Sequence, residues 1–275
     1  MPGGAEGPAG RTAVRRVLRP QLNRIVVVLS ALVLLPAIVV AERIRRGTGR
    51  PVARRGVLFV ARLCGVTFDV RGWRDDLAGS LFVANHSSPM DIPAMLVAAP
   101  DVRFVAAADL FRIPLLASAM RALGTVPLDR GHPEHARRQL ADLARGWSPG
   151  DQGDLTIFPE GGIAPRGRQL PFKSGAFRLA VDTGTTVVPV VLRGTGEVLP
   201  PRQRLLVRPG AVVIDLLAPV VTHGMSGQDH QALRHRIEVM VAAARTDGPG
   251  AADRPAEPAT VPPGPTTGGN PPDRA

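Results

Sequence analysis

The sequence predicts an α/β protein, with a mixed β-sheet flanked by helices, that follows an N-terminal membrane-anchoring helical segment. From about Val66 onward, short runs rich in β-branched residues alternate with stretches of helical periodicity, which is typical of a sheet with helices packed on it. Before that point, an uncharged apolar run is bounded by arginines. The chain is 44% hydrophobic and 21% charged, which argues against whole-chain disorder and against a polytopic membrane protein.

The N-terminal segment is divided into a leader and an anchor. Residues 1–10 have no apolar period, and we expect a flexible leader there. Arginines follow, and residues 25–41 then carry no charge. As a helix these residues would span roughly 26 Å, close to the hydrocarbon core of about 30 Å. We therefore assign residues 11–65 to membrane-anchor helices.

Two features of the anchor remain open at this point. A basic region before an apolar one also describes a cleaved signal peptide, although residues 39–41 offer a poor cleavage site and charged residues follow at once. Arginines flank the apolar run on both sides, so a spanning helix and a helix that dips into one leaflet, kinked at Pro36, both remain possible. Residues 51–66 are either a basic interfacial helix or an ordinary surface helix.

The domain proper is expected over residues 66–243. We expect strands over 66–70, 81–85, 103–107, 125–128, 155–158 and 187–192, and a final hairpin through Pro209-Gly210 that joins 205–207 to 211–217. Helices are expected near 91–98, 114–122, 133–146, 174–183 and 229–244. Residues 244–275 are rich in Pro and Gly, which predicts a disordered tail.

Charge and cysteine content restrict the partners. A net charge of +11 fits an anionic partner, but two Trp, eight Phe and no Tyr leave few aromatic rings for base stacking, so we expect no nucleic-acid partner. The single cysteine, Cys64, excludes a disulfide framework and any cysteine-based structural zinc site. No phosphate-binding glycine motif is present, and His132 and His135 look like an ordinary helix start.

The strongest local signal is the run from Asn85 to Asp91, directly after an apolar strand. A histidine at a strand end lies where α/β proteins place their sites, and the Asp91 carboxylate could orient the His86 ring so that the other ring nitrogen acts as a base. A structural interpretation competes with this one. Ser88, Pro89 and Asp91 also read as the N-cap and first turn of a helix, with His86 in a loop.

A second signal closes another strand at Phe158 to Gly162. Two glycines there permit a tight backbone with exposed N–H groups, suited to an anion or oxyanion. Cations at Arg166, Arg168 and Lys173, the only lysine in the chain, follow closely. A glycine-rich surface loop with solvated arginines would give the same pattern.

Taken in order, these blocks resemble the PlsC-like glycerolipid acyltransferase family. The N-H-x-x-x-x-D block is matched by Asn85, His86 and Asp91, and the G-x-x-x-x-x-R block by Gly124 to Arg130. The F-P-E-G block is matched by Phe158 to Gly161, with the similar run LPFKSGAFRLA after it, and the short block with a central proline by Val188 to Val190. The resemblance covers roughly residues 80–195.

The resemblance implies transfer of a fatty acyl group from acyl-CoA or acyl carrier protein to the free hydroxyl of a lysophospholipid, most simply 1-acyl-sn-glycerol-3-phosphate. It implies His86 as general base, with Asp91 orienting it. Gly161 and Gly162 would stabilise the oxyanion, and Glu160 would hold the loop or the nearby cations. Arg130, Lys173 and one of Arg166 or Arg168 would bind the acceptor phosphate. No metal or organic cofactor is expected, and the enzyme would lie on the cell membrane with its catalytic domain on the cytoplasmic side.

Two departures from the family pattern leave the acceptor open. Gly162 and Ile163 stand where the third block commonly continues with Thr and Arg, so an expected arginine is missing. Ala108 and Asp109 replace a common Lys-Glu pair. The alternatives are therefore the same chemistry on another lyso-lipid, or a catalytically silent, membrane-bound lipid-binding protein.

Overall fold

The computed structural model describes residues 8–147, 153–165, 168–203 and 205–246, and it contains a seven-stranded sheet of order β1-β7-β6-β2-β5-β3-β4. Every strand pair in it is parallel except β6 with β7, so the sheet is mixed, as predicted. The strands are β1 (Val66–Arg71), β2 (Leu81–Ala84), β3 (Arg103–Ala107), β4 (Val126–Leu128), β5 (Leu155–Ile157), β6 (Val187–Arg193) and β7 (Gly210–Leu216).

The prediction of a final hairpin that joins 205–207 to 211–217 is wrong. Residues 205–207 form no strand, and Leu205 adopts a left-handed φ of 64°. β7 instead pairs with β1 in parallel on one side, beginning at Val66 opposite Gly210, and with β6 antiparallel on the other. Its side chains Val212, Ile214 and Leu216 are all buried, which an exposed hairpin at the sheet edge could not achieve.

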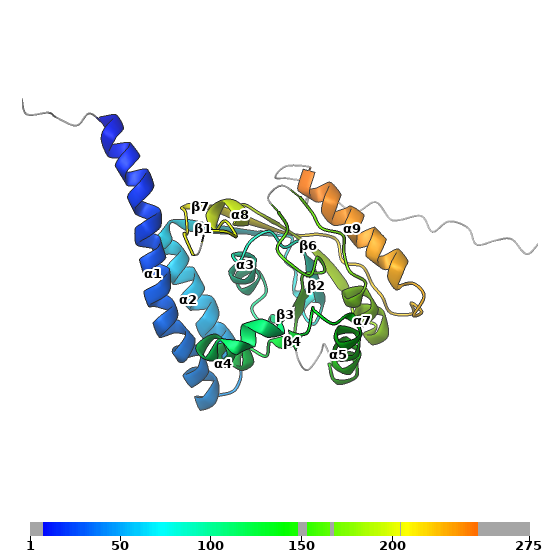
Figure 1. Ribbon diagram of the computed structural model, residues 1–275. Helices are drawn as coiled ribbons and strands as arrows, with labels where there is room; N and C mark the ends of the chain where they lie inside the picture. Colours follow the sequence, from blue (N-terminus) through cyan, green and yellow to red (C-terminus); the bar gives the residue numbers. More distant parts are fainter. Residues whose placement is uncertain (1–7, 148–152, 166–167, 204, 247–275) are drawn as a thin grey trace, which may run out of the picture.

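Helices cover both faces of the sheet (Figure 1). They are α1 (Pro8–Ile44), α2 (Gly49–Cys64), α3 (Asp91–Ala98), α4 (Pro114–Ala122), α5 (Pro133–Gly146), α7 (Gly175–Thr183), α8 (Thr195–Val198) and α9 (His230–Thr246), with 3-10 turns η1 (Asp75–Leu77) and η2 (Ala108–Arg112). The five helices expected after residue 90 are confirmed, whereas α8 and the two 3-10 turns were not expected.

The ends of the described chain differ from the expected boundaries. α1 begins at Pro8, inside the expected leader, and residues 1–7 lie outside the described residues. α9 continues to Thr246, past the expected domain end at residue 243, because Ala244 is buried and its carbonyl accepts a hydrogen bond from Arg193 Nη1 at 2.7 Å. The rest of the predicted tail, 247–275, lies outside the described residues.

Two hydrophobic cores lie on opposite faces of the sheet. Alternation along β2 sends Phe82 and Ala84 into the core shared with α1, α2, α3 and α4. Leu81 and Val83 face the other core, which α7 and α9 complete. Because both faces of β2 are covered, the strand is fully buried, and the turn that follows it starts from a rigid position.

α1 and α2 form a hairpin packed on the domain. Gly56 of α2 lies against Leu34 of α1 so closely that an added Cβ would come within 2.3 Å of it. The buried Asn23 side chain donates to the carbonyls of Cys64 and Val207, each at 3.0 Å, which fixes α1 to the domain. A polar clamp and close helix packing therefore hold one face of α1.

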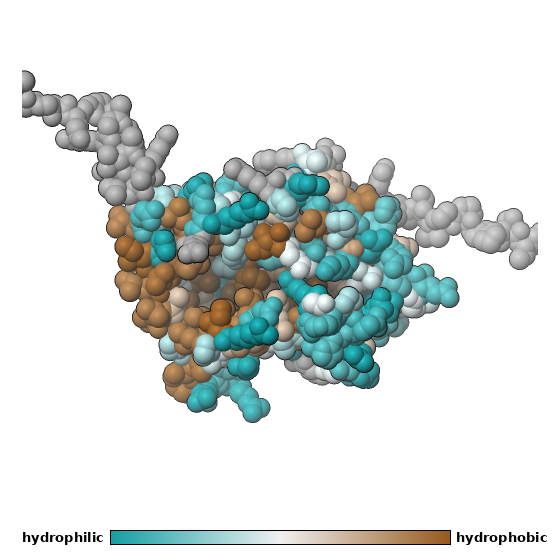
Figure 2. Space-filling model, viewed as in Figure 1, coloured by the Kyte–Doolittle hydropathy of each residue, from teal (hydrophilic) through white to brown (hydrophobic). Residues whose placement is uncertain are grey.

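The opposite face of α1 is apolar and exposed. Its outward side chains include Leu22, Ile25, Leu29, Leu32 and Val33, and Phe59 and Leu63 of α2 extend the same kind of surface. Figure 2 shows this hydrophobic surface over α1 and α2, in contrast to the hydrophilic surface over α5. The segment Arg19–Ile44 is long and apolar enough to cross a membrane, by length and composition. The N-terminal helices therefore fit membrane association.

Candidate active site

The turn after β2 brings the His86 ring and the Asp91 carboxylate into contact. His86 Nδ1 lies 2.8 Å from Asp91 Oδ2, and the same oxygen accepts the backbone N–H groups of Ser87 at 2.7 Å and Ser88 at 2.9 Å. The Asp91 side chain is completely buried. One carboxylate oxygen thus orients the imidazole and also closes the turn. The geometry therefore contains both the expected His–Asp contact and the expected structural role of Asp91 in the turn.

Ser88 differs from its expected N-cap role, since α3 begins only at Asp91. Its hydroxyl accepts the N–H of Met90 at 3.0 Å and donates to the Leu199 carbonyl at 2.6 Å. Residues 89 and 90 form a turn before the helix, which explains the later start. Ser88 therefore ties the turn to the end of α8.

The loop after β5 holds the backbone of His86 from both sides. The Glu160 Oε1 atom accepts the His86 N–H at 2.9 Å, and the Ala164 N–H donates to the His86 carbonyl at 2.8 Å. The Phe158 ring stacks on the imidazole with 4.3 Å between centroids. These two motifs meet because β2 and β5 are parallel neighbours, so their carboxyl ends lie at the same edge of the sheet.

Glu160 is a buried bridge between the two loops. Its second oxygen, Oε2, accepts the Leu170 N–H at 3.0 Å. Burial raises the pKa of this carboxyl, while the N–H groups of His86 and Leu170 act in the opposite direction. Glu160 was expected to hold either the loop or the nearby cations. Its two hydrogen bonds, to the backbone N–H groups of His86 and Leu170, fit the first of these roles.

Two further contacts, which the sequence alone did not reveal, fix the histidine turn to β6 and α8. The Asn85 side chain forms two hydrogen bonds with the backbone of Leu192 in β6: it accepts the Leu192 N–H at 2.8 Å and donates to the Leu192 carbonyl at 3.1 Å. The hydroxyls of Ser87 and Thr195 lie 3.1 Å apart. Asn85 had a sequence signal in its place before His86, whereas Thr195 had none.

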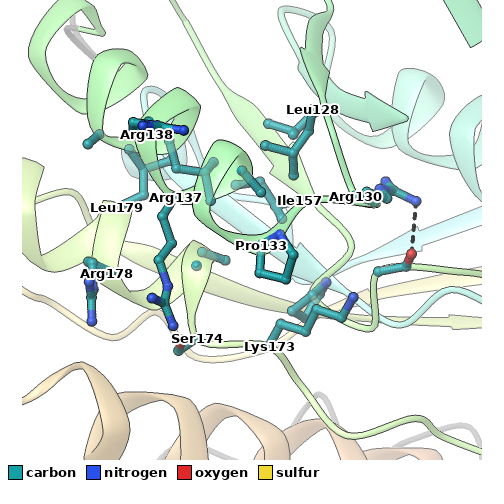
Figure 3. Close-up of a pocket in the computed structure, with 18 of the residues that line it drawn as sticks. Leu128, Arg130, Pro133, Arg137, Arg138, Ile157, Lys173, Ser174, Arg178 and Leu179 are labelled. Atoms are coloured by element: carbon teal, nitrogen blue, oxygen red, sulfur yellow. Dashed lines mark hydrogen bonds between the residues drawn. The ribbon is translucent and has the colours of Figure 1, made fainter. Parts of the chain in front are cut away.

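A cavity of about 500 Å³ lies between α5 and α7, on the face of the sheet that α7 covers. Phe158 contributes to its lining, but the Phe158 ring, which stacks on His86, packs in the core on the opposite face of the sheet. Arg130 and Lys173 lie at the end of the cavity beside Gly161 (Figure 3), and Arg130 Nη1 donates to the Gly161 carbonyl at 3.2 Å. Burial lowers the pKa of Arg130. Gly161 has a φ of 73°, and an added Cβ would lie 2.7 Å from Lys173 Nζ, so only glycine suits this position.

The remaining expected site residues are more dispersed. Arg166 lies outside the described residues. Arg168 is exposed and its carbonyl accepts Arg245 Nη2 of α9 at 3.3 Å, away from the cavity. The Gly161 N–H donates to the Phe158 carbonyl at 3.1 Å, whereas the Gly162 N–H has no acceptor in the described chain.

Among the described residues, no three His, Cys, Asp or Glu side chains are placed together so that they could hold a metal ion.

The fold and the site define a class of α/β proteins in which apolar N-terminal helices accompany a histidine–carboxylate pair at the sheet edge. A family model described as Acyltransferase matches residues 73–193. The chain is 36% identical over 141 residues to a chloroplastic 1-acyl-sn-glycerol-3-phosphate acyltransferase of Brassica napus, a match covering 51% of this chain and 40% of the relative. It is 28% identical over 222 residues to the mouse 1-acyl-sn-glycerol-3-phosphate acyltransferase alpha, covering 78% of each.

A solved structure extends the similarity to the anchor. The crystal structure of the 1-acyl-sn-glycerophosphate acyltransferase PlsC from Thermotoga maritima superposes with a TM-score of 0.65 at 25% identity, covering 86% of this chain and 99% of that one. Residues 73–193 therefore form an acyltransferase domain, and the chain is similar in sequence and fold to PlsC-like glycerolipid acyltransferases.

Proposed function

We propose that this protein transfers a fatty acyl group from acyl-CoA or acyl carrier protein to the free hydroxyl of 1-acyl-sn-glycerol-3-phosphate, giving phosphatidic acid. The observation that carries the proposal is the buried Asp91 carboxylate, 2.8 Å from His86 Nδ1. It favours the tautomer that carries a proton on Nδ1, which leaves Nε2 as the basic nitrogen. The names of the matched relatives supply the reaction and the acceptor.

In the proposed reaction, His86 acts first as a base and then as an acid. His86 Nε2 takes the proton of the acceptor hydroxyl while that oxygen attacks the thioester carbonyl. The Asp91 carboxylate stabilises the imidazolium that forms. When the tetrahedral intermediate collapses, the C–S bond breaks and the imidazolium returns the proton to the thiolate, so that ester and thiol leave and the base is regenerated. No acyl-enzyme is needed.

Positive charge and backbone donors support the anionic groups of this reaction. Arg130 and Lys173 lie together at the Gly161 end of the cavity and would bind the acceptor phosphate. The Gly162 N–H, which has no acceptor among the described residues, would donate to the oxyanion, while the Gly161 N–H already donates to the Phe158 carbonyl. Glu160 would act as a positioning residue, because its carboxylate touches the backbone of His86 and not the reacting atoms.

A different lyso-lipid acceptor is the second candidate, and Ile163 is the observation that favours it. This side chain is 38% exposed and apolar at a position where the family commonly has arginine. One cation fewer near the phosphate would weaken selection for a dianionic phosphomonoester.

The exposed apolar surface of α1 and α2 would place the enzyme on the cell membrane. Arginines on both sides of the apolar run fit a helix that dips into the cytoplasmic leaflet, with the catalytic domain in the cytoplasm.

A transfer assay on washed membranes tests the proposal. Labelled acyl-CoA or acyl carrier protein is offered with a panel of lysophospholipids, and membranes with the His86→Ala variant serve as control. Loss of the general base is expected to reduce the rate by about 10²–10⁴. Equal rates in both membranes would refute His86 as the base. His86-dependent labelling of another lipid would support the second candidate, and absence of transfer from both donors would indicate a silent lipid-binding protein.

A further inference from the structure

The segment that carries Lys173 has no regular structure of its own. Residues 168–173 belong to no helix or strand, so contacts with neighbouring elements set their position. On one side the segment meets the loop after β5. The Leu170 N–H donates to Glu160 Oε2 at 3.0 Å. The Lys173 N–H donates to the Pro159 carbonyl at 2.9 Å. The segment therefore lies directly against the loop that holds the backbone of the proposed base.

On the other side, two charged side chains of α9 bind both backbone polar groups of Phe172. Glu238 Oε1 accepts the Phe172 N–H at 2.9 Å, and Arg234 Nη1 donates to the Phe172 carbonyl at 3.1 Å. Arg234 and Glu238 lie about one helical turn apart, with 3.7 Å between Arg234 Nη1 and Glu238 Oε2. We call these two side chains the α9 clamp. The clamp is charge-neutral, and it leaves neither backbone group of Phe172 without a partner.

α9 gives the clamp a rigid base. Leu233, Ile237 and Val241 on its inner face are buried, and α9 (orange in Figure 1) packs on β6 and α7. The Phe172 ring is buried in the same core, where it stacks on Phe177 with 6.2 Å between centroids. Ring packing thus fixes the side chain of Phe172, while the clamp fixes the direction of the backbone on either side of it.

That direction matters for Lys173, the next residue along the chain. Its ammonium group lies beside Gly161, where an added Cβ would come within 2.7 Å of Lys173 Nζ. Arg130 lies at the same end of the cavity (Figure 3). A lysine side chain is a flexible stem with a charge at its tip, so the backbone at its base determines the space that the charge can reach.

We infer that Arg234 and Glu238 are positioning residues of the active site. They hold the backbone at Phe172, and this keeps the Lys173 ammonium group where it would bind the acceptor phosphate. The inference rests on the proposed function. α9 lies beyond residues 73–193, which the family model matches, so an element outside that match supports the site.

The single lysine makes a direct structural test possible. [15N]Lysine labelling of the full-length protein gives one backbone amide signal in an NMR spectrum, that of Lys173. We expect Glu238→Ala, which removes the acceptor of the Phe172 N–H, to move this signal, and Glu238→Gln, which keeps a carbonyl oxygen there, to leave it near its wild-type position. Val241→Ala is the matched control: it shortens a buried side chain of the same helix, so it should lower the melting temperature and leave the signal in place. An unmoved signal in Glu238→Ala, or an equal shift in Val241→Ala, would overturn the inference.

Steady-state kinetics tests whether the clamp acts through Lys173. Glu238→Ala is expected to raise the KM for the acceptor about fivefold to tenfold, the size of one net hydrogen bond, and to leave the KM for the donor unchanged. Glu238→Gln should stay close to the wild type. In a Lys173→Gln background, Glu238→Ala should raise the acceptor KM no further, because the group that the clamp positions is gone. An additive increase in the double variant, or a lower kcat with an unchanged acceptor KM, would overturn the inference.

A second variant covers the case in which Glu238→Ala does not fold. Arg234→Met removes the donor to the Phe172 carbonyl, so we expect the same signal shift and the same rise in the acceptor KM, and the absence of both would overturn the inference. A shifted signal, combined with an acceptor KM that Lys173→Gln leaves unchanged, would refute the acceptor role of Lys173 and leave the clamp standing. The labelled signal needs no substrate, so it tests the clamp even in a protein that transfers no acyl group, a result that would refute the proposed function alone.

Discussion

Replacing Asp91 with asparagine removes a charge but keeps the shape of the side chain. Asp91 Oδ2 accepts the N–H groups of Ser87 and Ser88 as well as the proton on His86 Nδ1. In Asp91→Asn, an amide nitrogen at that position would face two backbone donors, so the carbonyl oxygen is expected to stay there. The histidine would then keep its proton on Nδ1, and the variant would lose only the negative charge.

The size of the effect follows from that geometry. A hydrogen bond to a charged group contributes about 1.5–3 kcal/mol, and the imidazolium in the transition state would lose this advantage. The expected fall in kcat is therefore roughly 10- to 150-fold. Complete loss of the base in His86→Ala is expected to cost more, about 10²–10⁴. The Asn nitrogen would occupy the place of Asp91 Oδ1, which has no partner in the described chain, so stability should also fall by about 1–3 kcal/mol.

Single-turnover acyl transfer by both variants, with thermal melting followed by circular dichroism, is the test. A folded Asp91→Asn protein as inactive as His86→Ala would show that the Ser87 and Ser88 amides do not hold the tautomer. Activity within threefold of the wild type would show that the charge of Asp91 is not used.

Two further predictions concern buried carboxyls. Burial raises the pKa of Asp154 from 3.8 to about 6, so the folded state binds its proton more tightly than the unfolded chain and stability falls as pH rises between about 4 and 6. Asp154→Asn keeps an acceptor for the Gly79 N–H and should remove this pH dependence, with a gain of up to about 3 kcal/mol at pH 7 in urea denaturation; a midpoint that follows the wild type at every pH would contradict it. In Glu160→Gln, only one of the His86 and Leu170 amides keeps a carbonyl acceptor, so kcat should fall about tenfold with both KM values unchanged; a change in KM alone would argue against a positioning role.

Much of the fold was predictable because the local signals were strong. The apolar strands at 81–85 and 187–192 are continuous and buried on both faces, and the five helices expected after residue 90 have helical periodicity. The prediction of the final hairpin was wrong because it relied on the turn signal at Pro209-Gly210. The partner of a strand depends instead on which edges of the sheet are open. The choice of β1 and β6 as neighbours of β7 is a property of the whole sheet.

The chemical groups of the site can be identified from the order of residues along the chain: a histidine five positions before an aspartate, a glycine pair after a strand, and a lone lysine among arginines. Their arrangement in space arises from the folded protein. Parallel pairing of β2 with β5 brings Glu160 and Ala164 onto the backbone of His86, and the packing of α9 places Arg234 and Glu238 on the backbone of Phe172. These contacts join residues far apart along the chain, and local sequence patterns carry no signal of such distances.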